Sequence, residues 1–394
     1  MSEIKKKKIC IFLGSRANYS SLRPIMREIQ NNDNLELILF IGASALLDKY
    51  GEVVELVEQD GFKPDEYIYM MVEGSNPATM AKSTGLGLIE IANLLAKHKP
   101  DLTLVVGDRH EMLSITIASS LMNIPVAHTM GGEISGTIDE SIRHAITKFS
   151  HIHFPASKEA EENIIRMGEN PSNVFNMGCP RIDTVKEILE QNYDKEINNL
   201  MKSDDGVGDH FDINGDFILV SQHPVTSEFG KGEQQIHETL LALSDIQKSH
   251  DAHIIMLWPN ADAGSDEISR GIRKFREHYG LKNIRLFKNT PMHIYTHLMN
   301  KTKCLVGNSS SGIREGAFIG TPTVNIGTRQ NGRTKSINVV DVNYDRNEIK
   351  DAIIKQIEHG KYNPDKLYGS GDTSKKIVEK LTGITIDSQK KLHY

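Results

Sequence analysis

Several features are scarce in this 394-residue sequence, and each scarcity excludes a class of protein. Cysteine occurs only at Cys10, Cys179 and Cys304, so a disulfide framework is not expected and a reducing, cytoplasmic compartment fits better. No apolar run approaches the roughly 18 residues of a membrane span, and the run after the basic start "MSEIKKKK" is too short for a signal peptide. The formal net charge of −6 gives no bulk attraction to nucleic acid or an anionic membrane.

The composition that remains is that of a globular protein, 38% hydrophobic and 25% charged. A chain of this length exceeds one ordinary core of about 100–200 residues, so two domains are expected. Apolar runs such as "KICIFLG", "LTLVVGD" and "FILVSQHP" alternate with segments of helical spacing. Because these runs are continuous rather than alternating, they indicate parallel strands that are covered on both faces.

A polar stretch at residues 191–216 interrupts this alternation, and the same pattern then restarts. The sequence therefore predicts an α/β fold with two Rossmann-like domains, each a doubly wound parallel sheet, and a ligand cleft between them. We expect an N-terminal domain over residues 1–185 and a C-terminal domain over residues 186–373. A last helix, residues 374–394, is expected to pack back on the first domain.

Glycine, arginine, histidine, serine and carboxylates gather directly after the apolar runs. Ligands of open α/β sheets bind beyond the carboxyl ends of the strands. Each segment alone is compatible with an ordinary turn, but together they indicate a ligand site. The segments are "GSRANYS" (14–20), "GDRHE" (107–111), "HTMGGE" (128–133), "SQHPVTS" (221–227), "WPNADAGS" (258–265), "GNSSSGIRE" (307–315) and "GTRQNGR" (327–333).

The segment 307–315 is the best phosphate candidate. Its small residues admit close backbone approach, its hydroxyls donate, and the helix that follows offers a positive N-terminus. A serine-rich helix cap is the alternative, since the segment has neither a Walker lysine nor a GxGxxG fingerprint. Arg16 and Ser20 lie at another helix start, where Arg16 either clamps a diphosphate or is a surface arginine. His223, before Pro224, is either a phosphate neighbour or structural.

Acid and base candidates follow two other strands. Asp108 ends a strongly apolar run, where a carboxylate is costly to bury without a partner, and Arg109 is a phosphate ligand or such a partner. Asp139 is a proton-transfer candidate. Alternatively, it caps the helix that follows, for which Thr137 is a second candidate, or it forms an ion pair with Arg143. The remaining proton-transfer candidates and their neighbours are Glu133, Glu140, His128 and His144.

Metal binding has weak support in the sequence. His151 and His153 have strand spacing in "HIH", but no third ligand pattern follows them. A structural or exposed histidine pair is therefore the better interpretation, and no metal site is expected.

Together, the motifs resemble those of the hydrolysing UDP-N-acetylglucosamine 2-epimerases. The resemblance covers roughly residues 8 to 380, and its motifs are long and specific. They are "GSRANYSSLRPIM", "GDR", "GGEISGTIDESIRHAITK", "GCPRID", "QHPVT", "WPNADAGS", "GNSSSGIREGAFIGTPTVNIGTRQ" and "YGSGD".

The resemblance implies the GT-B fold, a UDP-sugar in the cleft, and no NAD or metal cofactor. It implies conversion of UDP-N-acetylglucosamine and water to N-acetylmannosamine and UDP, for sialic acid or related legionaminic acid synthesis. A base removes the C2 proton as UDP leaves C1, and water then adds to the glycal. The resemblance also implies a homo-oligomer, a dimer or a tetramer.

Site roles carried over by matching motif fall into two groups. Asp108 and Asp139 match carboxylates implicated in proton transfer, and His128 and Arg143 match polar neighbours of that site; Glu133 is a further candidate. The residues expected to bind UDP are Arg16, Ser20, Arg109, His223, Asn260, Ser309, Ser310, Glu315 and Arg329, with Glu315 on the ribose hydroxyls.

Two positions depart from the family pattern. Asn18 replaces an aspartate, and Met130 replaces a glutamate proposed as an acid or base. Methionine transfers no proton, so Asp108, Asp139 and Glu133 divide the work differently, the sugar differs, or the chain is impaired. We favour a combination of the first two: a thioether packs well against an apolar group, such as the methyl of UDP-2,4-diacetamido-2,4,6-trideoxyglucose.

Three other functions remain open from the sequence. A non-hydrolysing 2-epimerase returns an intact UDP-sugar, although the long "SGTIDESIRHAITK" match favours the hydrolysing branch. A glycosyltransferase with the same fold needs an acceptor. A protein that binds nucleotide sugars without turnover is the fourth hypothesis.

Overall fold

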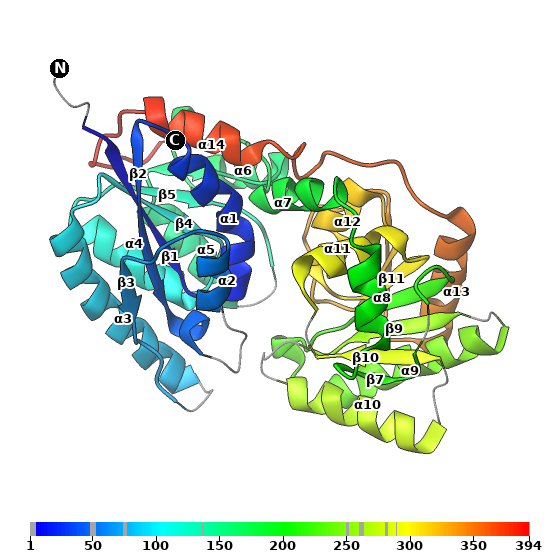
Figure 1. Ribbon diagram of the computed structural model, residues 1–394. Coiled ribbons are helices and arrows are strands. Elements are labelled where there is room, and N and C mark those ends of the chain that lie inside the picture. The colour runs from blue at the N-terminus through cyan, green and yellow to red at the C-terminus, as the bar shows by residue number, and fades with distance from the viewer. Residues whose placement is uncertain are drawn as a thin grey trace. The chain divides into compact units, whose positions relative to one another are not determined.

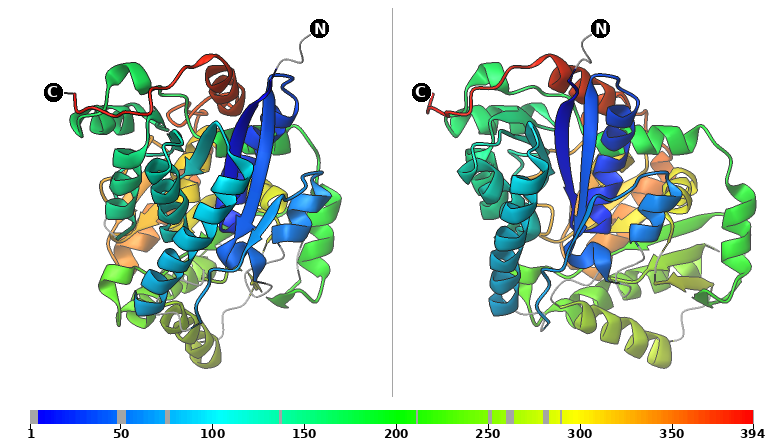
Figure 2. Two further views of the ribbon diagram at one scale, coloured as in Figure 1. Left: turned by 90° about the vertical axis from the view of Figure 1, so that its left-hand side faces the viewer. Right: turned by 60° about the vertical axis from the view of Figure 1, so that its left-hand side comes forward.

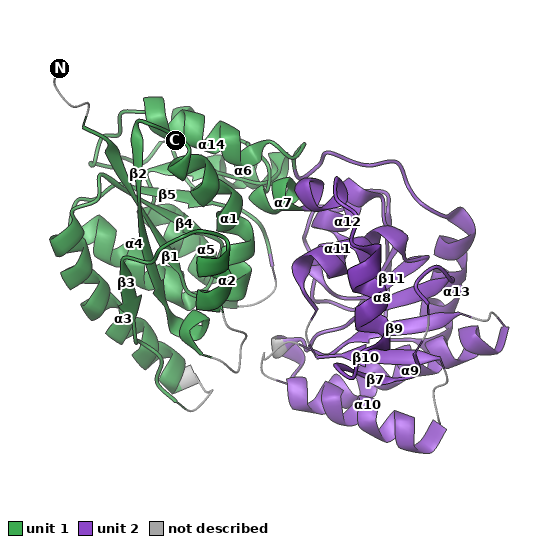
Figure 3. Cartoon of the chain, in the orientation of Figure 1, with its two compact units in different colours: residues 1–134, 138–184, 369–394 green, residues 135–137, 185–368 purple. Residues whose placement is uncertain are grey.

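The protein forms two compact units (Figures 1 and 3). The structure is a computed structural model. Unit 1 comprises residues 1–134, 138–184 and 369–394, and unit 2 comprises residues 135–137 and 185–368. The described residues are 5–47, 53–73, 77–135, 138–210, 212–249, 252–259, 264–279, 283–288 and 290–393.

Unit 1 contains a six-stranded sheet with the order β3-β2-β1-β4-β5-β6, and every pairing in it is parallel. This order places β1 next to β4 and β4 next to β5, so the loops after these three strands lie at one edge. The strands are β1 (Lys7–Leu13), β2 (Leu35–Gly42), β3 (Glu66–Ile68), β4 (Leu102–Val106), β5 (Val126–Thr129) and β6 (Ile152–Phe154).

Helices cover both faces of this sheet (Figure 2). On one side α3, α4 and α5 pack in a row, and on the other α1 contacts α14. All five residues of the run Ile9–Leu13 are therefore buried, which explains why the strand is apolar without alternation. The helices are α1 (Arg16–Gln30), α2 (Val53–Gln59), α3 (Pro77–His98), α4 (His110–Leu121), α5 (Ile138–Phe149), α6 (Lys158–Arg166) and α14 (Thr373–Gly383), whereas α7 (Pro180–Leu189) begins in unit 1 and ends in unit 2.

Unit 2 contains a seven-stranded sheet with the order β13-β12-β11-β8-β9-β10-β7. Its central strands β8, β11 and β12 are neighbours, so the loops that follow them also share an edge. The strands are β7 (Gly206–Gly208), β8 (Phe217–Ser221), β9 (His253–Leu257), β10 (Ile284–Phe287), β11 (Cys304–Gly307), β12 (Thr323–Ile326) and β13 (Val339–Val342).

Two apolar clusters hold helices to the faces of this second sheet. One cluster includes Leu240 and Phe275, from α9 and α10. The other includes Ile197 and Leu298, from α8 and α11. The helices are α8 (Asp194–Lys202), α9 (Gly232–Ser249), α10 (Ser265–Tyr279), α11 (Met292–Lys301), α12 (Arg314–Ile319) and α13 (Arg346–His359).

The polar stretch at residues 191–216 is more structured than its composition indicates. It contains α8, whose Ile197 and Met201 are fully buried at the i, i+4 spacing of a helix face. It also contains β7, which pairs antiparallel with β10, so the second sheet is not purely parallel. These two residues, with the partly buried Leu200, dock the helix despite its polar composition.

The expected C-terminal helix is α14, which ends at Gly383. β-branched residues Ile384, Thr385 and Ile386 follow, and they favour extended backbone over helix. Residues 384–393 continue without a helix, and the His393 amide donates to the carbonyl of Gly168, 3.0 Å away. This tail therefore runs back over unit 1 (Figure 2).

Candidate active site residues

In unit 1, Asp108 and Arg143 form an ion pair between the loop after β4 and helix α5. The Arg143 side chain is buried, 1% exposed, whereas that of Asp108 is 28% exposed. Arg143 also donates from Nη1 to the backbone carbonyl of Glu133, 2.6 Å away. One guanidinium thus connects two of the predicted carboxylate positions and fixes the loop after β5 against the loop after β4.

His128, on β5, is fully buried and contacts the residue before Asp108. Its Nε2 donates to the carbonyl of Gly107 at 2.8 Å, so Nδ1 accepts from the Thr147 hydroxyl at 3.2 Å. Burial lowers the pKa of His128 to about 3, although the bond to Gly107 acts in the opposite direction. A neutral ring therefore holds the carbonyl that precedes Asp108.

Asp139 lies in the first turn of α5 and is exposed, and Glu133 is buried. An acidic side chain in a first turn is favoured by the positive end of the helix dipole. Glu140 and His144 are four residues apart on the same helix, and His144 Nε2 lies 3.6 Å from Glu140 Oε1. Thr137, the second cap candidate, lies outside the described residues.

Arg16 begins helix α1 and is partly buried, which lowers the pKa of its guanidinium. The Ser20 hydroxyl donates to the carbonyl of Arg16 at 3.0 Å, so this serine supports the first turn of the helix. Ser15 caps the helix: its hydroxyl accepts from the Asn18 amide and donates to Asn18 Oδ1, 2.9 Å away. Asn18 therefore completes the cap in place of the aspartate expected from the family pattern.

Arg109 immediately precedes α4 and is 43% exposed. Its Nε donates to Oε1 of Glu111 at 2.8 Å. The Glu111 side chain is 1% exposed and was not among the residues singled out from the sequence. It is the one carboxylate of α4, which marks it in the sequence without revealing its pairing with Arg109.

Met130 follows β5 and is 6% exposed. Its φ of +61° lies in the left-handed region, which is uncommon for a residue with a side chain. Its Sδ lies 3.9 Å from the Sγ of Cys179, and its amide donates to the carbonyl of Phe154 at 2.9 Å. The thioether thus packs within unit 1 against a second buried sulfur atom.

In unit 2, Asn308 holds His223 by its backbone. The amide of His223 donates to Asn308 Oδ1 at 2.7 Å, and Asn308 Nδ2 donates to the carbonyl of His223 at 2.8 Å. Burial and the nearby charge of Arg329 lower the pKa of His223 to about 3, so its ring is neutral. The carbonyl of Asn308 accepts from Arg329 Nη1 at 3.1 Å and from Gln330 at 2.8 Å. One asparagine therefore joins the loops after β8, β11 and β12.

The serine-rich segment after β11 begins with a tight approach between strands. Gly307 has a φ of +137°, and a Cβ there would lie 2.1 Å from the carbonyl oxygen of Ser221, so only glycine fits. Ser309 caps the short turn that follows, and its hydroxyl lies 2.8 Å from that of Ser311. Ser310 is partly exposed. The segment 307–315 therefore contains the serine cap that was the alternative interpretation, and it is also the segment predicted to bind phosphate.

Glu315 lies in the first turn of α12 and is buried. Asn260 lies outside the described residues. Asn308 was part of a quoted motif but was not singled out, because no residue pattern reveals that one amide bonds both backbone groups of a residue 85 positions away.

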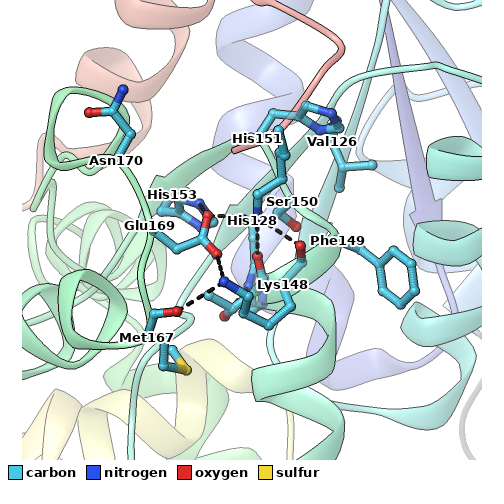
Figure 4. Close-up of polar contacts among 12 residues, drawn as sticks. Val126, His128, Lys148, Phe149, Ser150, His151, His153, Met167, Glu169 and Asn170 are labelled. Atoms are coloured by element: carbon cyan, nitrogen blue, oxygen red, sulfur yellow. Dashed lines mark hydrogen bonds and ion pairs between the residues drawn. The ribbon is translucent and has the colours of Figure 1, made fainter. Parts of the chain in front are cut away.

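The histidines of "HIH" lie beside His128 and have structural partners of their own (Figure 4). His151 Nδ1 accepts from the Val126 amide at 3.1 Å, and its Nε2 donates to the carbonyl of Ser388. His153 Nε2 lies 3.1 Å from Glu169, which Lys148 and Lys390 also contact at 2.6 Å each. Within the described residues, no group of three or more histidine, cysteine or acidic side chains has an arrangement suited to a metal ion. None of the helices in that same part of the chain has the length and apolar character to cross a membrane.

Comparisons with known proteins identify the family of the chain. The family model described as UDP-N-acetylglucosamine 2-epimerase matches residues 27–382. A Legionella pneumophila protein named UDP-N,N'-diacetylbacillosamine 2-epimerase (hydrolyzing) is 31% identical and aligns over 97% of both chains. A Campylobacter jejuni protein named GDP/UDP-N,N'-diacetylbacillosamine 2-epimerase (hydrolyzing) is 33% identical over 86% of this chain and 85% of its own.

A solved structure shows the same fold at lower identity. The Neisseria meningitidis UDP-GlcNAc 2-epimerase, bound to UDP-GlcNAc, matches with a TM-score of 0.79 at 19% identity, covering 95% of this chain and 99% of its own. The two α/β units, whose sheets are parallel apart from β7, are those of a GT-B-like fold. The chain therefore belongs to the UDP-N-acetylglucosamine 2-epimerase family.

Proposed function

We propose that the protein is a hydrolysing UDP-sugar 2-epimerase, which converts a UDP-2-acetamido sugar and water to the free 2-epimer and UDP. The observation that carries this proposal is the ion pair between Asp108 and Arg143, with the same guanidinium bonded to the carbonyl of Glu133. Removal of a proton beside a sugar carbon needs a carboxylate held at a fixed position. The names of the Legionella and Campylobacter relatives support the hydrolysing form.

In the proposed reaction, a base takes the C2 proton while UDP departs from C1. Water then adds to the glycal at C1, and an acid returns a proton to C2 from the other face. We propose that Asp108, Glu133 and Asp139 share the base and acid roles. Arg143 positions Asp108, and the neutral ring of His128 positions the loop that carries it.

Departure of UDP needs positive groups and hydrogen-bond donors for the diphosphate. We propose that Arg16, Ser20 and Arg109 of unit 1 contribute these contacts, with His223 and Arg329 of unit 2. The backbone bonds from Asn308 support this role, because they fix the loop of His223. The remaining proposed UDP contacts are Asn260, Ser309, Ser310 and Glu315.

For the sugar, we propose UDP-N,N'-diacetylbacillosamine, the 2,4-diacetamido-2,4,6-trideoxy sugar. Both relatives of at least 30% identity named above carry that sugar in their names. The thioether of Met130 does not bear on this choice, because it is buried against Cys179 within unit 1. UDP-GlcNAc is the second candidate: it gives the family its name, and a Neisseria meningitidis UDP-N-acetylglucosamine 2-epimerase is 28% identical over 93% of this chain.

The test is a comparison of kcat/KM for the two UDP-sugars, with no acceptor present and with UDP release as the readout. We expect the enzyme to release UDP from the trideoxy sugar, with or without release from UDP-GlcNAc. The kcat/KM for the trideoxy sugar should be the higher of the two. A preference for UDP-GlcNAc contradicts the proposed sugar but not the reaction. An absence of UDP release, with an intact 2-epimeric nucleotide sugar as product, identifies a non-hydrolysing enzyme instead.

We also propose that the protein works in the cytoplasm as a homo-oligomer. Its three cysteines are buried thiols outside any disulfide bond, which fits a reducing compartment. Light scattering coupled to size-exclusion chromatography measures the oligomeric state, and a monomer at all concentrations contradicts this part of the proposal.

A further inference from the structure

Glu111 is a buried carboxylate between two basic side chains of the same turn. Its Oε1 accepts from Arg109 Nε at 2.8 Å, and its Oε2 lies 3.1 Å from His110 Nδ1. The Glu111 side chain is 1% exposed, that of His110 14% and that of Arg109 43%. A buried carboxylate is costly unless it is paired, so this arrangement specifies where Arg109 lies.

The backbone of the neighbouring loop is shaped around the same carboxylate. Gly14 directly follows β1, and a Cβ at this position would lie 2.3 Å from Glu111 Cγ and 3.1 Å from its Oε1. The carbonyl of Gly14 is itself fixed by the Ser44 hydroxyl at 2.9 Å and the Ala45 amide at 3.1 Å. Glycine at this position therefore admits the carboxylate between the loops that carry Arg16 and Arg109.

The charge of Glu111 is directed mainly to Arg109. Burial lowers the pKa of His110; Glu111 acts to raise it and Arg109 to lower it further. The imidazole is therefore neutral at neutral pH, while a guanidinium is always charged. The carboxylate thus has one permanent cationic partner.

We propose that Glu111 is a positioning residue that orients Arg109 for the diphosphate of the UDP-sugar. Because Nε is bonded to Glu111, the plane of the guanidinium and the direction of its two terminal nitrogens are set before the ligand arrives. A pre-oriented guanidinium loses less conformational entropy when it binds phosphate oxygens. This inference rests on the proposed function, since Arg109 is a UDP contact only there.

The test is a double-mutant cycle with Arg109→Ala, Glu111→Gln and the combination, in which the Kd of UDP is measured by calorimetry on the full chain. We expect Glu111→Gln to weaken UDP binding about tenfold in the wild-type background and less than about twofold in the Arg109→Ala background. Glu90→Gln, on the exposed face of α3, is the control and leaves the Kd unchanged. Glu111→Ala provides a second arm with no acceptor left for Nε.

The cycle separates a positioning role from a merely structural one. An equal loss of affinity in both backgrounds, or none in the wild-type background, overturns the inference. If the wild-type protein binds UDP and the cycle shows the expected coupling but no UDP-sugar is turned over, the proposed function fails while the inference stands. If turnover occurs but Arg109→Ala leaves UDP binding unchanged, the inference alone fails.

Discussion

Asp108 and Arg143 lie 35 residues apart in the sequence and form an ion pair in unit 1. The pair joins the loop after β4 to the helix α5, and its guanidinium is buried while its carboxylate is partly exposed. A carboxylate that is both held and accessible suits proton transfer. This pair is therefore the first target for substitution.

Asp108→Asn removes the carboxylate and keeps the size of the side chain. We expect the rate of UDP-sugar turnover to fall by about 10²- to 10⁴-fold, the usual contribution of a general acid or base. Binding of UDP, measured by calorimetry, stays near its wild-type value. Asp33→Asn, at an exposed position, is the matched control. Retention of more than a tenth of the activity removes Asp108 from the proton-transfer roles.

Met130 offers a test of what its side chain contacts. Met130→Leu conserves volume beside Cys179 and is expected to cost less than about 1.5 kcal/mol in urea unfolding. Met130→Glu buries a carboxylate and is expected to cost about 2–3 kcal/mol or more, without raising turnover of UDP-GlcNAc. A Met130→Glu variant that is as stable as the wild type and faster on UDP-GlcNAc would show that this position faces the sugar.

Asn308 is expected to matter for both folding and UDP binding. Asn308→Ala removes two hydrogen bonds to the backbone of His223, each worth about 1 kcal/mol, and leaves a buried amide and carbonyl without this partner. We predict a loss of about 2–3 kcal/mol in unfolding free energy and at least about tenfold weaker binding of UDP. Asn347→Ala, on the exposed side of α13, serves as the comparison. If Asn308→Ala leaves the affinity for UDP unchanged, Asn308 does not support the UDP site.

The pH dependence of stability is expected to report on Glu169. Burial acts to raise its pKa, but hydrogen bonds from His153, Lys148 and Lys390 outweigh burial and lower it to about 2. In the unfolded chain a glutamate has a pKa near 4.3, so above that pH the charged form of Glu169 stabilises the fold, by about 3 kcal/mol. This stabilisation is lost as the pH falls from about 5 to 2.

The measurement for this prediction compares wild type and Glu169→Gln in urea at several pH values. The difference in unfolding free energy should be largest at neutral pH and shrink below pH about 4. A difference that stays constant down to pH about 2.5 contradicts a depressed pKa for Glu169.

Much of the fold was predictable because the buried strands of a parallel sheet appear in the sequence as continuous apolar runs. The continuous apolar runs of β1, β4 and β8 predict strands covered on both faces, and the i, i+3, i+4 spacing of Leu22, Ile25 and Met26 predicts α1. Helix α8 was missed, since only Ile197 and Met201 mark its buried face. Short edge strands such as β7 contain too few residues to show a pattern.

The site was predictable in residue type but not in pairing. Sequence reasoning selected Asp108 and Arg143 separately and considered Asp139 as a helical partner for Arg143. The pairing with Asp108 depends on how α5 packs against α4 and β5, which is a tertiary property. Glu111 and Asn308 act on neighbours through geometry that a one-dimensional pattern does not contain.

Incubation of the protein with UDP-N,N'-diacetylbacillosamine, or with UDP-GlcNAc, in deuterated water and inspection of the products by proton NMR tests the central claim most directly. The account predicts UDP and a free sugar that is inverted at C2 and carries solvent deuterium there. An intact nucleotide sugar as the only product, or a released sugar that keeps its original C2 proton, contradicts it.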